Sequence, residues 1–165
     1  LPHFAVSIAH ERNGEVVAGV IYDPVKNEIF WAEKGEGAYL GDRRLRVSGR
    51  AKLADSLAAT GIPFLGHQEG EGHQILLAQL GRVMAKTSGV RRWGAAALDL
   101  AFVAAGRYDA FWETGLSAWD VAAGIVMVRE AGGDVSQIDG KPHKLDSATI
   151  LAANGKLHRH YIKLL

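Results

Sequence analysis

The chain has 165 residues, of which 48% are hydrophobic and 22% are charged, and its formal net charge is +1. This profile is typical of a globular protein with one sizeable core, and it gives no whole-molecule reason to expect nucleic acid or a membrane surface as partner. The absence of cysteine excludes disulfides, a thiolate nucleophile and Cys-based zinc sites, and it favours a cytoplasmic location. No apolar run approaches the roughly 20 residues that cross a bilayer.

The first fifty residues predict an antiparallel meander. Segments rich in β-branched and aromatic residues alternate with turn signals, of which Asn13-Gly14 is a strong one. We expect strands over residues 4–10, 15–23 and 28–33, with the sheet continuing through glycine-containing turns over residues 34–49. Phe4, Val6 and Ile8 alternate toward one face, so the first ten residues should belong to the sheet. The first residue is leucine, not methionine, and we expect that the natural beginning of the protein is missing.

The pattern changes after residue 51, where helices begin to alternate with strands. We expect helices over residues 72–86, 94–106, 121–131 and 156–165, and strands over residues 88–91, 107–113, 133–140 and 148–154. This alternation predicts an α/β layer arrangement. The sequence contains no linker of low complexity, so the boundary near residues 51–56 indicates a change of layer type.

Most catalytic signatures are absent from the sequence. There is no phosphate-binding loop, no dinucleotide fingerprint, no G-x-S-x-G motif and no pair of histidines at zinc-ligand spacing around a glutamate. Most of the seven histidines are interpreted as surface residues. The chemistry must therefore come from carboxylates.

Two carboxylates lie at one junction, where Glu113 ends an expected strand and Asp120 begins an expected helix. Functional groups of α/β sheets gather at such junctions. Asp120 could be a simple helix-capping acid worth about 1 kcal/mol, with Glu113 a solvated strand end. Alternatively, Asp120 could be an oxygen ligand for Mg²⁺, with the helix N-terminus attracting a phosphate. The second helix start, over residues 94–96, could likewise admit a ligand to its backbone or serve close helix packing.

A family resemblance covers nearly the whole chain. The segment "GLSAWDVAAGIVMVREAGGDVS" (115–136) closely resembles the inositol monophosphatase signature W-D-x-A-A-G followed by E-A-G-G. The likeness extends through "RRWGAAALDLAFVAAGRYDAFWE" (91–113) and "GVIYDPVKNEIFWAEKGEGAYLGDRRLRVS" (19–48). The opening "LPHFAVSIA" (1–9) resembles the segment that follows the family's first metal motif, D-P-x-D-G-T-x-N-F.

The resemblance implies a layered α-β-α-β-α sandwich, here incomplete at its N-terminus. Residues 1–55 would complete an antiparallel-sheet α+β domain, and residues 56–165 would form the α/β domain. It further implies a homodimer and a Mg²⁺-dependent phosphatase, often lithium-sensitive, that hydrolyses a phosphate monoester such as inositol monophosphate. In this family metal-activated water attacks phosphorus without a covalent intermediate.

The resemblance also assigns residues. Asp120 would be a metal ligand lying near the substrate, Glu113 would accept a hydrogen bond from a substrate hydroxyl, and the backbone of residues Gly94, Ala95 and Ala96 would meet the sugar or inositol ring. Trp119 would be a packing residue that fixes the loop. Ala95 stands where many family members carry Ser or Thr, which removes one hydroxyl contact.

The departures from the family pattern leave three hypotheses. The family's other metal ligands, an upstream glutamate and the D-P-x-D-G-T aspartates, have no counterpart in this chain, so we expect a fragment of a phosphatase that is inactive alone. The second hypothesis is a truncated, non-catalytic interaction module. The third is a parent protein that binds RNA or the transcription machinery. Nucleic acid is the less favoured partner, because one cluster alone points to it: Arg43, Arg44, Arg46, Arg50 and Lys52.

Overall fold

The first five strands form one antiparallel sheet in chain order. The computed structural model describes residues 2–62 and 70–165. The strands are β1 (Val6–Arg12), β2 (Glu15–Asp23), β3 (Glu28–Glu33), β4 (Gly37–Leu40) and β5 (Arg43–Arg44). Asn13 and Gly14 in the first hairpin adopt positive φ angles of 54° and 80°, as a tight turn between twisted strands requires. The predicted meander is confirmed.

Strand β1 forms the edge of this sheet. Phe4, Val6 and Ile8 share one face, as expected, but that face is open: their side chains are 56%, 53% and 63% exposed. The opposite face of β1 approaches the next layer, where Ser7 Oγ donates to the backbone oxygen of Trp119 at 3.1 Å. The expected strand is confirmed from residue 6 onward, whereas residues 2–5 precede it and residue 1 lies outside the described residues.

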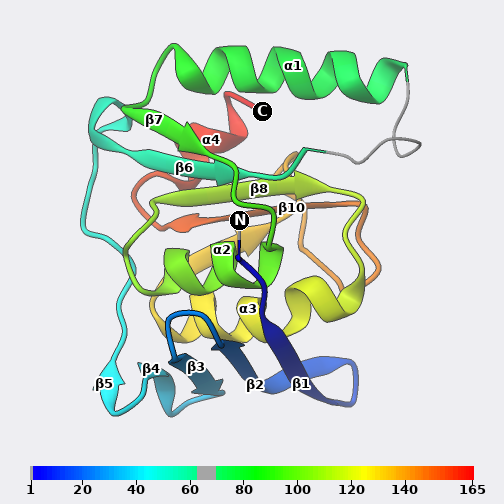
Figure 1. The fold of residues 1–165 in the computed structure, drawn as a ribbon. Helices are drawn as coiled ribbons and strands as arrows, with labels where there is room; N and C mark the ends of the chain where they lie inside the picture. Colours follow the sequence, from blue (N-terminus) through cyan, green and yellow to red (C-terminus); the bar gives the residue numbers. More distant parts are fainter. Residues whose placement is uncertain (1, 63–69) are drawn as a thin grey trace.

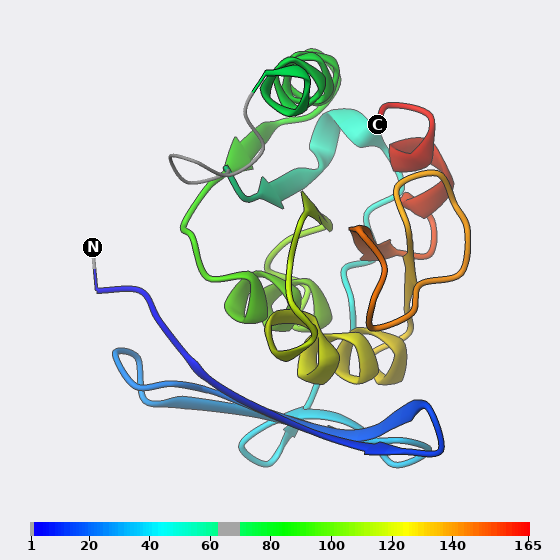
Figure 2. The ribbon, with the colours of Figure 1, turned by 90° about the vertical axis from the view of Figure 1, so that its right-hand side faces the viewer.

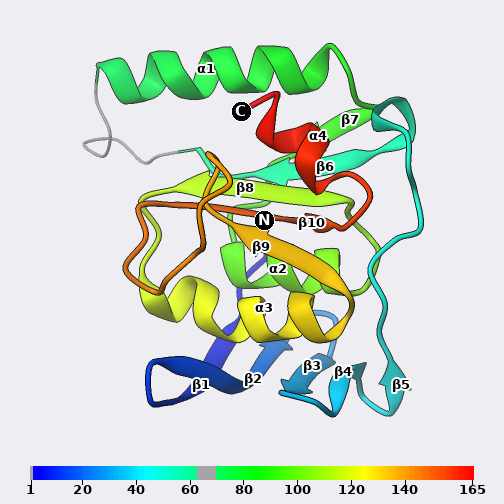
Figure 3. The same cartoon turned by 180° about the vertical axis from the view of Figure 1, so that it is seen from behind.

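The second sheet is mixed and has the order β7-β6-β8-β10-β9. Its strands are β6 (Leu57–Thr60), β7 (Gly89–Arg91), β8 (Ala110–Thr114), β9 (Gly133–Ser136) and β10 (Thr149–Asn154). Strand β6 runs parallel to both β7 and β8, and β10 runs antiparallel to β8 and β9. Seen from behind, β9 forms the outer edge beside β10 (Figure 3). Sequence reasoning missed β6, because its alanine-rich residues carry little strand propensity.

The helices alternate with the sheets to give four layers (Figures 1 and 2). Helices α1 (Glu71–Met84) and α4 (His158–Ile162) cover the outer face of the second sheet, and α2 (Ala96–Ala104) and α3 (Ala118–Glu130) lie between the two sheets. This α-β-α-β order confirms the expected α/β sandwich. Helix α4 is shorter than predicted, and α3 begins three residues earlier. None of the helices in the described part of the chain combines the length and apolarity needed to cross a membrane.

Helix α3 is the central element of the core. Its residues 121–128 are all buried, as are residues 97–104 of α2, which explains why both segments are apolar apart from Asp99. Helix α3 packs closely against β2 and α2 because a glycine, which has no side chain, lies at each contact. A Cβ on Gly19 of β2 would lie 2.7 Å from Ala123 Cα, and a Cβ on Gly124 would overlap the Leu100 side chain.

The C-terminal end of α3 holds a turn of the first sheet. The two carboxylate oxygens of Glu130 accept hydrogen bonds from the backbone N–H groups of Gly35 and Gly37, each at 3.0 Å. Both glycines have positive φ angles, 88° and 105°, so the turn places its amides where one carboxylate reaches both. Glu130 therefore fastens the β3–β4 turn to α3.

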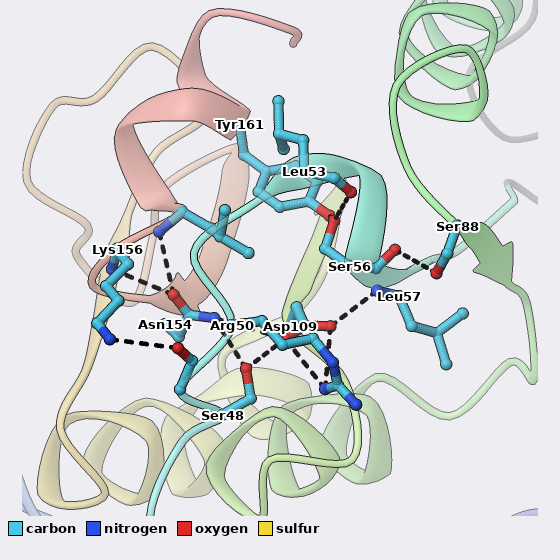
Figure 4. A network of polar contacts seen from close by, with 12 residues as sticks. Ser48, Arg50, Leu53, Ser56, Leu57, Ser88, Asp109, Asn154, Lys156 and Tyr161 are labelled. Atoms are coloured by element: carbon cyan, nitrogen blue, oxygen red, sulfur yellow. Dashed lines mark hydrogen bonds and ion pairs between the residues drawn. The ribbon is translucent and has the colours of Figure 1, made fainter.

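The connection between the sheets is anchored by a buried carboxylate, Asp109 (Figure 4). Asp109 accepts hydrogen bonds from the Leu57 backbone N–H at 2.8 Å and from the Ser48 hydroxyl. Asn154 donates to Ser48 Oγ at 2.9 Å, and Arg50 lies 3.4 Å from Asp109. The strands of the two sheets lie on either side of residue 55, and the division into two domains at that point stays a prediction.

Candidate functional site

The site forms where the carboxyl ends of β6 and β8 meet the amino ends of α2 and α3. Parallel pairing of β6 with β8 brings their carboxyl ends to one edge, and the short turn after β8, with Gly115 at a φ of 75°, leads directly into α3. Glu113 therefore projects from a strand end and Asp120 from the first turn of the following helix. The junction predicted from the sequence is confirmed.

A cavity of about 180 Å³ lies at this junction. It is lined by Gly61, Ile62, Arg92, Gly94, Ala95, Ala96, Glu113, Leu116 and Asp120. The five residues to which the resemblance gives a metal or substrate contact are all in this set. A neighbouring cavity of about 320 Å³ shares Gly94, Ala95, Ala96 and Asp120 and extends toward residues 3–7. The structure thus brings the predicted residues together, while their chemical roles stay predictions.

Asp120 combines a structural contact with exposure to the cavities. Its Oδ2 accepts a hydrogen bond from the Ser117 backbone N–H at 2.9 Å, and its own N–H donates to the Ser117 oxygen at 3.0 Å. The side-chain bond from Asp120 to the Ser117 N–H belongs to a capping box, in which the Ser117 side chain in turn faces the Asp120 N–H, so the capping interpretation is correct in geometry. Capping and metal binding are compatible, because Asp120 also lines both cavities.

Two acidic residues, Glu113 and Asp120, line the cavity, and the charge of Glu113 also acts on a third, the buried Asp99. Burial raises the pKa of Glu113 to about 7, with the Asp120 charge adding to the shift and Arg92 opposing it. Burial likewise raises the pKa of Asp99 to about 8, with the Glu113 charge adding to it. Asp99 Oδ1 is buried and has no hydrogen-bond partner within the described residues. Such an environment favours protons or a bound cation.

The start of α2 forms the opposite wall. Gly94 has a φ of 86°, and Ala95 is the N-cap residue with an extended φ of −140°, so the chain turns sharply into the helix. The N–H groups of a first helical turn have no partners within the helix and attract anions. With alanine at position 95, only the backbone can donate there.

The structure adds residues to the site that sequence reasoning missed. Gly61, Ile62 and Arg92 line the cavity, and Arg92 Nη2 donates to the Ile62 oxygen at 3.2 Å. Recognising β6 would have revealed the first two, because residues after parallel strands face this edge. The packing role predicted for Trp119 is wrong, because its side chain is 73% exposed and lines the larger cavity.

The Asp120 carboxylate is the acidic group that both cavities share. Carboxylate oxygens are ligands that Mg²⁺ prefers, so this side chain has the chemistry of one magnesium ligand. Across residues 2–62 and 70–165, however, no three acidic or histidine side chains form a cluster able to hold a metal ion.

The prediction that most histidines lie at the surface is wrong for His158. Its side chain is buried, and its Nε2 lies 3.0 Å from Ser136 Oγ.

Comparison with known proteins identifies the family. The profile of the Inositol monophosphatase family matches residues 1–165, and the chain belongs to this family. An Inositol-1-monophosphatase of Mesorhizobium japonicum is 55% identical over 163 residues, which cover 99% of this chain and 60% of that protein. A Nus factor SuhB of Pseudomonas aeruginosa is 51% identical over 156 residues, which cover 94% of this chain and 57% of that protein.

The fold is found in solved structures of the same group. The extragenic suppressor protein suhB of Bartonella henselae superposes with a TM-score of 0.91 at 51% identity, over 97% of this chain and 61% of that one. The chain thus spans about 60% of the length of these relatives. The α/β fold expected from the resemblance is confirmed.

Proposed function

We propose that this chain is part of a Mg²⁺-dependent phosphatase that hydrolyses a phosphate monoester related to inositol monophosphate. One observation carries the proposal: Asp120, Glu113 and the amino end of α2 line a single cavity. A carboxylate such as Asp120 can bind a metal cation, Glu113 can accept a hydrogen bond from a hydroxyl, and a helix amino end can bind an anion. A phosphate monoester with its metal ion presents all three groups. The name of the Mesorhizobium japonicum relative supports the substrate class.

The residues divide the work by their chemistry. Asp120 would hold Mg²⁺ through a carboxylate oxygen, and Glu113 would accept a hydrogen bond from a substrate hydroxyl. The first turn of α2 would orient the ring through backbone N–H groups. Bound Mg²⁺ would supply Lewis-acid stabilisation of phosphoryl oxygens and lower the pKa of water. One carboxylate is too few for this task, so the proposal includes inactivity of the isolated chain.

A chimera tests the proposal. The chain is joined to the part of the Mesorhizobium japonicum relative that the match does not cover, and phosphate release from inositol 1-phosphate is measured with millimolar Mg²⁺. We expect turnover by the chimera that chelation abolishes, and no release above background by the chain alone. A folded, homodimeric chimera without turnover would contradict the proposal and favour the truncated interaction module. Turnover by the chain alone would refute its inactivity.

A second candidate function is RNA binding in transcription. Arg43, Arg44 and Arg46 are exposed around β5, and the Pseudomonas aeruginosa relative bears the name of a Nus factor. Against it, the Arg44 guanidinium lies over the Tyr39 ring at 5.9 Å and Arg50 pairs with Asp109, so part of the cluster has structural partners. RNA binding that weakens steeply with salt and is lost on changing the three exposed arginines to alanine would support it.

A further inference from the structure

Gly61 lies directly against the carboxylate of Glu113. A Cβ on Gly61 would overlap the carboxyl carbon and both carboxylate oxygens of Glu113. Parallel pairing explains the contact, because Thr60 of β6 is the partner of Trp112 in β8, and one further step along both strands leads to Gly61 and Glu113. The two residues are thus neighbours by register.

Space, not backbone conformation, requires glycine at this position. Gly61 is absent from the glycines with positive φ in the described chain, so an alanine could adopt its backbone angles. The three atoms nearest to the missing Cβ all belong to the Glu113 side chain. An added methyl group would therefore displace one carboxylate without straining the chain.

The surrounding contacts hold the backbone of both residues in place. Thr60 Oγ1 donates to the Trp112 oxygen at 2.8 Å, which fixes the two strand ends relative to each other. On the far side of Gly61, the oxygen of Ile62 accepts the hydrogen bond from Arg92. With the backbone held on both sides, a methyl group at position 61 would move the Glu113 carboxylate away from its present place in the cavity wall.

We infer that Gly61 is a positioning residue for Glu113, and that its bare backbone sets the distance between the Glu113 carboxylate and a hydroxyl of a phosphate monoester in the cavity. The inference deepens the proposed function and rests on it, because Glu113 meets a substrate only if the cavity is the substrate site. Gly61 would then determine selectivity for esters that carry hydroxyl groups beside the phosphate.

A double-mutant cycle tests the inference in the chimera described above. Gly61→Ala, Glu113→Asp and the double variant are compared on inositol 1-phosphate, which has neighbouring hydroxyls, and on 4-nitrophenyl phosphate, which has none. We expect Gly61→Ala to lower the ratio of kcat/KM for the two esters about tenfold, mainly through the KM for inositol 1-phosphate. In the Glu113→Asp background the same change should have little effect, because the shorter side chain leaves room for the methyl group.

Gly49→Ala is the matched control, since Gly49 has no positive φ and no atom within 4 Å of its added Cβ. Equal losses on both esters, or the same loss with aspartate at position 113, would overturn the inference and leave Gly61 a purely structural residue. If the chimera hydrolyses neither ester, the proposed function fails. Crystal structures of the chain with Gly61 and with alanine then decide the positioning: an unmoved Glu113 carboxylate refutes it, and a displaced one supports it.

Discussion

At the scale of single residues, Asp120 has two possible duties that substitution can separate. The side-chain oxygen of Asn can accept the same hydrogen bond from the Ser117 N–H, so Asp120→Asn should change the melting temperature of the chain very little. In the chimera it should lower kcat/KM by at least about a hundredfold, because an amide oxygen is a poor Mg²⁺ ligand and each 1.36 kcal/mol of transition-state stabilisation is about tenfold in rate.

Glu113→Gln provides the comparison for Asp120. It should mainly raise KM, because Glu113 is proposed to contact a hydroxyl and not the reacting phosphorus. Measuring kcat and KM for both variants at limiting Mg²⁺ separates the duties. Wild-type turnover by Asp120→Asn at limiting Mg²⁺ would reduce that residue to a helix cap.

Asp99 should make stability depend on pH. Its folded-state pKa is about 8, well above the ordinary aspartate value of about 4. The folded protein thus retains a proton that the unfolded chain releases, so this contribution to stability decreases as the pH rises from about 4 to 8 and levels off above. Asp99→Asn should raise stability at pH 8 by on the order of 2 kcal/mol and much less at pH 4.5.

The measurement for Asp99 is urea unfolding of the chain at several pH values, with the exposed Asp42→Asn as control. The gain at pH 8 should be absent from the control. A gain of equal size at both pH values would show that lost packing or hydrogen bonding, and not ionisation, determines the effect.

At the scale of elements, the glycines of α1 and α3 should respond oppositely to alanine. Gly124→Ala in α3 places a methyl group into the Leu100 side chain and should destabilise the chain by about 1–3 kcal/mol. Gly81→Ala in α1 meets open space and should stabilise by about 0.5–1 kcal/mol through helix propensity. Thermal unfolding of the two variants gives the comparison, and a tolerated methyl group at position 124 would contradict the close packing of α2 on α3.

The sequence predicts elements well where the hydrophobic period or the turn chemistry is strong. Strands β2 and β3 match their predicted bounds, because Asn13-Gly14 and the β-branched runs agree. Strand β6 could not be predicted, since only its place between β7 and β8 makes an alanine-rich segment a strand. Asp120 and Glu113 could be assigned to the site because they belong to a recognisable sequence motif. Gly61 and Arg92 could not, because only the tertiary structure brings them to the cavity.

At the scale of the whole molecule, the two sheets depend on the network around Asp109. Asp109→Ala would leave the partly buried Leu57 N–H and the Ser48 hydroxyl without the carboxylate that accepts their hydrogen bonds, at a cost of about 3 kcal/mol. The exposed Asp139, paired with Lys141, provides the control, because its change to alanine should cost less than about 1 kcal/mol. Urea unfolding measures both. The Asp109 variant should also be cleaved faster by proteases within residues 45–56. If both variants lost the same small amount of unfolding free energy, the network around Asp109 would not stabilise the fold.

The clamp that Glu130 forms on Gly35 and Gly37 changes how variants in the signature segment should be interpreted. In a deep mutational scan, positions 120 and 130 would both look intolerant when catalysis is selected, and their nearness in the motif would invite one explanation. A selection for protein abundance should separate them. Glu130→Gln, which keeps only one strong acceptor for two amides, should lower the abundance of folded protein, whereas Asp120→Asn should not. A damaging substitution in this segment could then be classified by its position in α3. Substitutions at the N-terminal end would reduce catalysis, and substitutions at the C-terminal end would reduce the amount of folded protein.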